Sequence, residues 1–389
     1  MAPCRPGAAM ATGRQGVAFL PEYALLVGSG PFWSRAEDDI AAARRRLFVQ
    51  ALTFEGDRAG LAVAAALHAS GAADRRVLVD DFTRAVVNDH FVVSPHYLAS
   101  AAFRAEIRAT RAMFRGLQHQ GVAVRATNPI RGSPIRYGLR NHKKLILADD
   151  VAYIGGINFS DHNFAWHDLM LRVEGAGPAD FLAGDFEATW DGRGTFAKAE
   201  YGDLRLYALD GGTNAAGLAD LMAAIDGAAQ SIEIVTPYLS FPFTDRLAAA
   251  ARRGVAVDLF TPWANNKPMV RDYQLAVAAR SGFRVVLMDE MSHLKAMLID
   301  GHLLVLGSIN FDFPSYFSLE EYVALIDNPV LVADFRARVL DPIRRSALSR
   351  VDWRPSPWRA LRSHMLLHFA GAAMARTGRI RRDAVDWRA

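Results

Sequence analysis

The sequence predicts an α/β protein built from two copies of one β/α unit, with a site formed between the copies. Three observations support this fold class. Helix-like and strand-like segments alternate along the chain, which is typical of sheets covered by helices. The segments of the first half recur in the same order in the second half. A short polar pattern, H-x-K-x4-D, occurs once in each half, at 142–149 and 293–300.

The first half contains two helix-to-strand units and an insertion. DDIAAARRRLFVQALTF, at 38–54, predicts a helix that runs into a strand. GLAVAAALHASGAADRRVLVDDF, at 60–82, predicts a helix, a turn and a strand. The insertion covers roughly 86–120 and is rich in aromatic residues and arginine. Because strands that alternate with helices usually pair in parallel, we expect a mainly parallel sheet.

The second half repeats these units at 217–239 and 243–262. Glycine and charged residues interrupt the pattern near 190–203, where we place the boundary between the halves. We therefore expect four regions: a flexible N-terminus at 1–20, a first domain at 21–200, a second domain at 201–350, and a basic amphipathic tail at 351–389.

Composition indicates a soluble globular protein with large cores, because 51% of the 389 residues are hydrophobic and the mean hydropathy is +0.06. Cys4 is the only cysteine, which excludes an intramolecular disulfide, and no Cys/His cluster indicates structural zinc. The sequence has neither a signal-peptide pattern nor the run of roughly 20 apolar residues that spans a membrane. We expect a soluble or peripheral protein.

Charge is unevenly distributed. The net charge is +4, while residues 351–389 hold eight Arg and three Asp and therefore carry +5. The rest of the chain is close to neutral. Because nucleic-acid-binding proteins usually spread basic charge over their binding face, we expect no nucleic-acid partner.

The paired motifs contain the candidate catalytic residues. On a strand, residues i and i+2 point the same way, so His142 should share a face with Lys144, and His293 with Lys295. Asp149 and Asp300 have the opposite parity and precede turns. We expect these two aspartates to fix the turn or a neighbouring strand and not to touch substrate.

A second repeated signal, GGINFS at 155–160 and GSINFD at 307–312, predicts a phosphate site. Small residues allow backbone N–H groups to approach a phosphate, while amides and hydroxyls add donors. Together with the two lysines these residues make an anion site without metal, next to two histidines suited to nucleophilic and acid/base roles. The candidate phosphate-binding residues are Gly156, Asn158, Ser308 and Asn310.

A catalytic histidine needs a carboxylate to orient its other ring nitrogen. Asp168 follows His142 by 26 residues, and Glu321 follows His293 by 28, each at the start of an expected strand. These two are the candidates, with Glu320 as the near alternative to Glu321. The alternative interpretation is that they are ordinary carboxylates at strand ends, without a catalytic role. The remaining histidines considered show no ligand spacing and are expected on the surface or in loops: His90, His96, His119, His162 and His167.

These motifs resemble those of the phospholipase D superfamily over about residues 30–345, with particular likeness to bacterial cardiolipin synthases. RNHKKLILADDVAYIGGIN, WHDLMLRVEG and FEATW carry that likeness. The resemblance implies a duplicated α-β-α sandwich, two domains related by a pseudo-twofold axis, an active site between them, a phosphohistidine intermediate, and neither metal nor cofactor. Leu294 and Leu319 depart from the family pattern, as does the missing Arg after Asp312, and these departures bear on head-group specificity.

The resemblance also implies a two-step mechanism. One histidine attacks a phosphodiester and the other protonates the leaving alcohol, then activates an incoming alcohol. Family analogy suggests His142 as nucleophile and His293 as acid/base, although pseudo-symmetry makes the reverse nearly as plausible. The expected reaction converts two phosphatidylglycerol molecules to cardiolipin and glycerol. Alternatives are a hydrolytic phospholipase D, a nucleic-acid phosphodiesterase, and a non-catalytic membrane scaffold.

The tail predicts a membrane-surface helix. Apolar residues recur three and four positions apart, and arginines supply the polar side. Such a helix can attach a protein to anionic lipid on the cytoplasmic side of the membrane, although it could instead pack against the protein body. The apolar positions are Trp358, Leu361, Met365, Phe369 and Ala372, and the arginines are Arg359, Arg362, Arg376, Arg379, Arg381 and Arg382.

Overall fold

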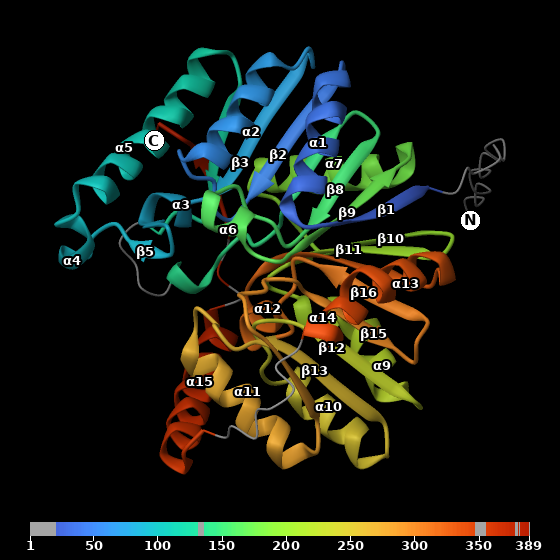
Figure 1. Ribbon diagram of the computed structural model, residues 1–389. Coiled ribbons are helices and arrows are strands. Elements are labelled where there is room, and N and C mark those ends of the chain that lie inside the picture. The colour runs from blue at the N-terminus through green and yellow to red at the C-terminus, as the bar shows by residue number, and fades with distance from the viewer. Residues whose placement is uncertain (1–20, 131–135, 347–354, 378–379, 381, 389) are drawn as a thin grey trace, which may run out of the picture.

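The computed structural model describes residues 21–130, 136–346, 355–377, 380 and 382–388. The N-terminal segment expected to be flexible, 1–20, lies outside these residues, as do Arg379 and Arg381. Two eight-stranded sheets form the body, one from each half of the chain (Figure 1). The duplicated α/β architecture expected from the sequence is therefore confirmed.

The first sheet is covered on its outer face by α1 (Ser29–Ala42), α2 (Arg58–Ala69) and α5 (Ala101–His119), while α7 (Ala176–Trp190) packs on its inner face. Its strands, in spatial order, are β1 (Glu22–Val27), β9 (Leu169–Glu174), β8 (Val151–Gly155), β7 (Leu145–Ala148), β2 (Arg46–Ala51), β3 (Asp74–Asp80), β6 (Ala123–Thr127) and β18 (Ala384–Asp386).

The second sheet repeats this order. Its outer face carries α9 (Ala219–Gly227), α10 (Phe243–Arg252) and α11 (Pro268–Ser281), while α13 (Pro329–Phe335) and α14 (Asp341–Ser346) join the inner core. Its strands, in spatial order, are β10 (Ala197–Tyr201), β11 (Leu204–Asp210), β17 (Glu320–Ile326), β16 (Leu303–Gly307), β15 (Ala296–Ile299), β12 (Ser231–Val235), β13 (Ala256–Pro262) and β14 (Arg284–Met288).

The expectation of mainly parallel sheets is wrong. In the first sheet only β2–β3 and β3–β6 pair in parallel, and in the second only β12–β13 and β13–β14 do. The motif strands cause the difference, because β7–β8 and β15–β16 are hairpins closed by tight turns after Asp149 and Asp300. A hairpin forces antiparallel pairing, and the parallel pairs are confined to β2–β3–β6 and β12–β13–β14.

One hydrophobic core joins the two halves. Alternate residues of β7 enter different cores: Leu145 and Leu147 belong to the inner core shared with the second sheet, while Ile146 faces the outer helices. In β15, Leu298 likewise points to the inner core and Met297 outward. Apolar residues at every position of both motif strands are thus explained by burial on two faces.

Two segments differ from the domain boundaries expected from the sequence. The proposed boundary at residue 200 falls within β10, which pairs with β11 in the second sheet. The tail does not stand apart, because α15 (Pro357–Thr377) packs on α11 and α12 (Phe313–Phe317) while β18 pairs with β6 of the first sheet. None of the described helices is long and apolar enough to cross a membrane.

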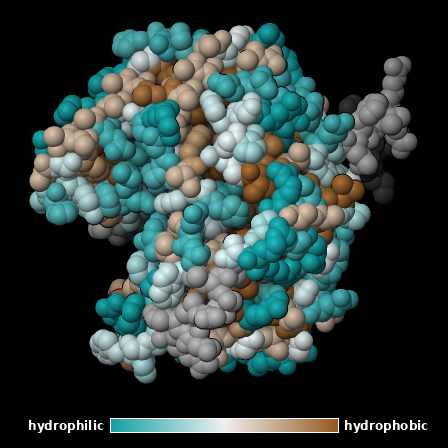
Figure 2. Space-filling model, in the orientation of Figure 1, coloured by the Kyte–Doolittle hydropathy of each residue, from teal (hydrophilic) through white to brown (hydrophobic). Residues whose placement is uncertain are grey.

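The insertion forms a lobe at one end of the first half. It contains a two-stranded hairpin, β4 (Val86–Val87) and β5 (His90–Phe91), followed by α4 (Pro95–Leu98) and α5. The surface is hollowed between this lobe and the second half (Figure 2). The hairpin, after α3 (Phe82–Ala85), lies on the same side of the molecule as α15 (Figure 1).

Candidate active site

The two motif histidines lie on extended segments that reach from one half of the chain to the other. The His142 N–H donates to Glu320 O at 2.9 Å, and the His293 N–H donates to His167 O at 2.8 Å. Regular strand structure begins only at Leu145 and Ala296, after each motif lysine. The main chain of each histidine is therefore fixed by the opposite half.

The orienting carboxylates also cross between the halves. His142 Nδ1 lies 3.0 Å from both carboxylate oxygens of Glu321, and His293 Nδ1 lies 2.9 Å from Asp168 Oδ2. All four side chains are buried. Glu320, the near alternative, instead accepts a hydrogen bond from Asn128 Nδ2 at 2.9 Å. The described structure thus brings together both histidines and both carboxylates expected from the sequence.

This pairing sets the chemistry of the imidazoles. When Nδ1–H donates to a carboxylate, Nε2 keeps its lone pair and can act as nucleophile or base. Burial lowers the pKa of His142 to about 4 and the pKa of His293 well below its usual value. Both rings are therefore neutral at physiological pH.

The two carboxylates have different surroundings. Burial raises the pKa of Glu321, but His142 and Lys144 outweigh it and the net pKa is lowered. Hydroxyls from Ser308 and Ser315 also donate to this carboxylate. Burial raises the pKa of Asp168 to about 6. Glu321 is the more strongly stabilised anion of the pair.

The motif lysines do not line the cavity directly. Lys144 Nζ donates to His142 O at 2.7 Å, and Lys295 Nζ donates to His293 O. Burial lowers the pKa of Lys144 to about 7 and that of Lys295 to about 8. Lys267, which no motif marks in the sequence, lines the cavity.

Asp149 and Asp300 occupy the turns where the sequence placed them. Asp149 accepts backbone N–H groups of Arg44, Arg45 and Arg46 at 2.8 to 3.0 Å. Asp300 accepts those of Ala229, Gln230 and Ser231 at 2.7 to 3.2 Å. Each carboxylate ties the motif hairpin to the start of a neighbouring strand and does not line the cavity.

The four candidate phosphate-binding residues divide into two pairs. Asn158 and Asn310 line the cavity, and no described residue bonds to Asn310 Oδ1. Gly156 and Ser308 do not line it. A Cβ at Gly156 would lie 2.2 Å from Asp168 Oδ1, so the glycine makes room for that carboxylate. The Ser308 hydroxyl donates to Glu321. These two residues support the carboxylates and do not line the cavity.

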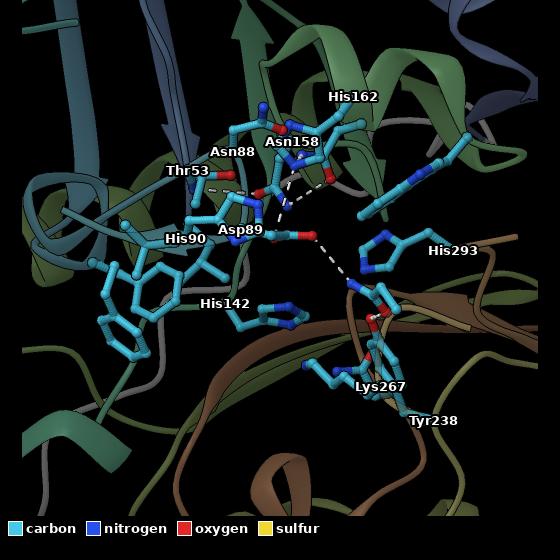
Figure 3. Close-up of a pocket in the computed structure, with 18 of the residues that line it drawn as sticks. Thr53, Asn88, Asp89, His90, His142, Asn158, His162, Tyr238, Lys267 and His293 are labelled. Atoms are coloured by element: carbon cyan, nitrogen blue, oxygen red, sulfur yellow. Dashed lines mark hydrogen bonds and ion pairs between the residues drawn. The ribbon is translucent and has the colours of Figure 1, made fainter. Parts of the chain in front are cut away.

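The histidines open into one cavity of about 630 Å³, lined by both halves of the chain (Figure 3). His90 and His162 line it, which corrects the expectation that they are ordinary surface or loop residues. The insertion supplies part of this wall, and no repeat or ligand spacing marked it in the sequence. The other polar lining residues are Thr53, Asn88, Asp89, Tyr137, Asn158, Asn163, Tyr238, Asn266, Lys267 and Asn310.

Outside the cavity, three carboxylates lie close enough to hold a metal ion. Among the described residues only Glu55, Asp57 and Glu106 form such a group, with ligand atoms within 4.8 Å of one another. They contact neither motif histidine, although Glu55 Oε2 lies 4.0 Å from His162 Nδ1. Glu55 Oε2 accepts the Asn88 N–H at 3.0 Å, which ties the group to the insertion hairpin.

In sequence, the chain is similar to known cardiolipin synthases. Residues 221–340 match a family model described as "Cardiolipin synthase, PLD-like domain". The chain is 27% identical over 250 residues to a minor cardiolipin synthase of Bacillus subtilis, covering 56% of this chain and 62% of that protein. It is 27% identical over 292 residues to cardiolipin synthase A of Yersinia pseudotuberculosis, covering 67% and 60%. The chain thus spans about 60% of the length of these relatives.

Solved structures with a similar fold include two enzymes. Phosphatidylserine synthase of Haemophilus influenzae superimposes with a TM-score of 0.67 at 16% identity, covering 91% of this chain and 96% of that one. Polyphosphate kinase of Porphyromonas gingivalis gives 0.52 at 13% identity, covering 90% and 56%. At these identities the likeness shows a common fold.

Proposed function

We propose that this chain is a member of the phospholipase D superfamily that transfers a phosphatidyl group from a phospholipid to an alcohol, as its similarity to cardiolipin synthases suggests. The observation that carries the proposal is the pair of buried histidines, each held through Nδ1 by a carboxylate and each lining the same cavity. A phosphohistidine route needs two imidazoles, one to bond phosphorus and one to move the proton.

The reaction proceeds in two balanced steps. In the first, Nε2 of His142 bonds phosphorus, the bond from phosphorus to the head-group oxygen breaks, and protonated His293 gives that oxygen its proton. In the second, neutral His293 takes the proton from an acceptor hydroxyl. The acceptor oxygen then bonds phosphorus, and the phosphorus–nitrogen bond to His142 breaks. Both histidines return to their starting states.

The carboxylates support His142 as the nucleophile. Its ring becomes cationic when Nε2 bonds phosphorus, so it benefits most from an anion that stays ionised. Glu321 fits that requirement because His142, Ser308 and Ser315 all donate to it. Asp168, whose pKa burial raises to about 6, suits the histidine that cycles between neutral and charged forms.

Substrate charge explains how His293 becomes an acid. Burial lowers the pKa of His293 most, and the positive charges of Lys295 and Lys144 lower it further. A bound phosphodiester anion offsets those charges and raises the pKa of His293. His293 therefore takes up a proton from solvent when the substrate binds.

Phosphatidylglycerol is the proposed donor and acceptor, with cardiolipin and glycerol as products, because the matched relatives are cardiolipin synthases. The test is lipid mass spectrometry on protein mixed with phosphatidylglycerol vesicles in EDTA. His142→Ala and His293→Ala are the controls. Cardiolipin that disappears in both variants is the expected result. Phosphatidic acid as sole product would replace transfer with hydrolysis, and turnover that persists in both variants would contradict the histidine mechanism.

The proposed membrane contact is the outer face of α15. Its inner face packs Leu367 against Phe241, Tyr273 and Phe313. The outer face leaves apolar side chains in solvent, beside the exposed Arg362 and Arg376. A row of large apolar residues flanked by arginine suits an anionic lipid surface. The row consists of Trp358, Leu361, Met365, Leu366 and Phe369.

A further inference from the structure

The insertion hairpin places a carboxylate at the cavity. Its two-residue turn, Asn88–Asp89, joins β4 to β5, and both residues have positive φ, 50° and 60°. Such a turn favours Asn and Asp, which tolerate left-handed backbone. The Asn88 N–H donates to the fully buried Glu55 at 3.0 Å, and the hairpin is closed by Val92 N–H to Ala85 O at 2.9 Å. The backbone therefore sets where Asp89 points.

Asp89 reaches across the cavity to the opposite half. Asn266 Nδ2 donates to Asp89 Oδ2 at 3.1 Å, and the Tyr238 hydroxyl donates to Asn266 Oδ1. His162 Nε2 lies 3.8 Å from Asp89 Oδ1. Figure 3 shows Asp89 projecting into the space between His162 and the motif histidines. Its side chain keeps 47% of its surface accessible, so a ligand can reach the carboxylate.

A carboxylate in this position does not suit a phosphate. Asp89 is the only acidic residue among the described residues that line the cavity, and its charge repels the phosphodiester that the histidines must receive. It suits a part of the substrate that carries hydrogen-bond donors and no negative charge. The head group bonded to the phosphate is that part.

The neighbouring groups discriminate between head groups. Lys267, next to Asn266, also lines the cavity, and its ammonium disfavours a cationic head group. Asp89 disfavours a carboxylate. The amides of Asn88 and Asn266 offer both donors and acceptors, which matches hydroxyls that donate and accept at once. A neutral polyol satisfies all three conditions.

We propose that Asp89, supported by Asn266 and His162, forms a subsite that hydrogen-bonds the hydroxyls of a neutral polyol head group such as glycerol. The inference rests on the proposed transfer function and specifies its alcohol. The acceptor alcohol enters at the position that the leaving alcohol vacates. The same subsite therefore binds both alcohols. Asp89 is a specificity-determining residue and takes no part in the phosphorus chemistry.

The test compares acceptors at a fixed donor. Vesicles containing phosphatidyl-p-nitrophenol supply a leaving group that does not need the subsite. Glycerol, 1-propanol and ethanolamine compete as acceptors, and mass spectrometry measures the ratio of the three phospholipid products. Wild type should favour glycerol. Asp89→Ala should lower the ratio of glycerol to propanol product by about tenfold, the loss expected from one hydrogen bond.

Two further variants sharpen the result. Asn266→Ala should lower the same ratio in the same direction, and it serves if Asp89→Ala is poorly folded. Asp226→Ala removes an exposed carboxylate that pairs with Arg246 far from the cavity, and it should leave the ratio at the wild-type value.

Each outcome is decisive. An unchanged glycerol-to-propanol ratio in both cavity variants would overturn the subsite while leaving transfer intact. A selective loss of the ethanolamine product would mean that Asp89 binds a cation, which also overturns the polyol assignment. If wild type releases p-nitrophenol but forms none of the three products, the transfer function itself fails and the subsite fails with it.

Discussion

His142 Nδ1 lies 3.0 Å from the Glu321 carboxylate, although 179 residues separate them in the chain. The equivalent pair, His293 and Asp168, crosses in the opposite direction at 2.9 Å. Neither half of the duplicated chain therefore holds an oriented histidine by itself. The shared inner core, which buries apolar side chains from both sheets, fixes the relative position of the two halves and with it both imidazoles.

The crossed pairing predicts that Glu321→Gln damages catalysis more than folding. The amide is the same size, but it does not hold the Nδ1–H tautomer or stabilise the cationic ring. We expect kcat to fall by a hundredfold or more, as an order of magnitude for a lost orienting carboxylate. Glu320→Gln is the matched control on the neighbouring position, because the Glu320 side chain bonds Asn128, and only its main-chain oxygen, which the substitution leaves in place, contacts His142. Equal losses in the two variants, measured beside thermal melting, would contradict the assignment.

The sequence alone predicted the features of the fold that depend on local residue pattern. The duplication, the apolar strands that follow each motif, and the two turn aspartates all follow from periodicity and parity. Strand direction was not predictable in this way. Alternation of helix and strand suggested parallel pairing, whereas the turns after Asp149 and Asp300 make hairpins.

Tertiary docking determines the rest of the site. Along the sequence, Asp168 follows His142 and Glu321 follows His293. In the fold each histidine instead bonds the carboxylate of the other half, His142 to Glu321 and His293 to Asp168. Asp89, His90 and His162 line the cavity through an insertion and a short helix, α6 (Asp161–Ala165), without a repeated signal. Lys267 comes from the start of α11 and reaches the cavity through the fold alone.

Asp149 and Asp300 should contribute to stability. Each caps three backbone N–H groups and sits at positive φ, 51° and 47°. Replacing either by Ala removes the acceptor and adds strain. We expect a loss of about 1–3 kcal/mol in the free energy of unfolding. Asn keeps an acceptor and tolerates this backbone, so Asp149→Asn should lose clearly less in a urea titration. An Ala variant as stable as wild type would refute the capping role.

Gly156 should not tolerate a side chain, because there is no room for one beside Asp168. A methyl group there would meet the Asp168 carboxylate at 2.2 Å and displace it from His293. We expect Gly156→Ala to lower kcat by about a hundredfold, similar to misplacing a catalytic group by an ångström. Gly184→Ala, on α7 with nothing within 4 Å of the added methyl, is the control and should keep full activity. Normal activity in Gly156→Ala would show that the carboxylate does not orient His293.

Glu55 should make stability depend on pH. Burial raises its pKa from 4.5 to about 9, so the folded state holds a proton that the unfolded state releases at lower pH. The stabilisation is complete below about pH 4.5 and is lost as pH rises towards about 9. Glu55→Gln removes this loss and should raise the melting temperature at pH 8 relative to wild type, with little change at pH 4.5. An identical pH profile in both proteins would contradict a buried, protonated Glu55.

The outer face of α15 should control membrane binding. Deleting the tail is an unsuitable test, because β18 pairs with β6 and Arg382 donates to Ser318 O, so truncation removes parts of the fold. Phe369→Glu instead changes a side chain that is 77% exposed. We expect it to reduce sedimentation with anionic vesicles several-fold while melting stays unchanged, because an acidic group replaces apolar area facing lipid.

Val330→Glu is the matched control for this face. Val330 is also 77% exposed but lies at the start of α13, on the second half away from α15. It should bind vesicles as wild type does. Activity on vesicles should fall with binding in Phe369→Glu, whereas activity on a detergent-dispersed substrate should not, because the cavity is untouched. Equal vesicle binding by both variants would locate the membrane contact elsewhere on the molecule.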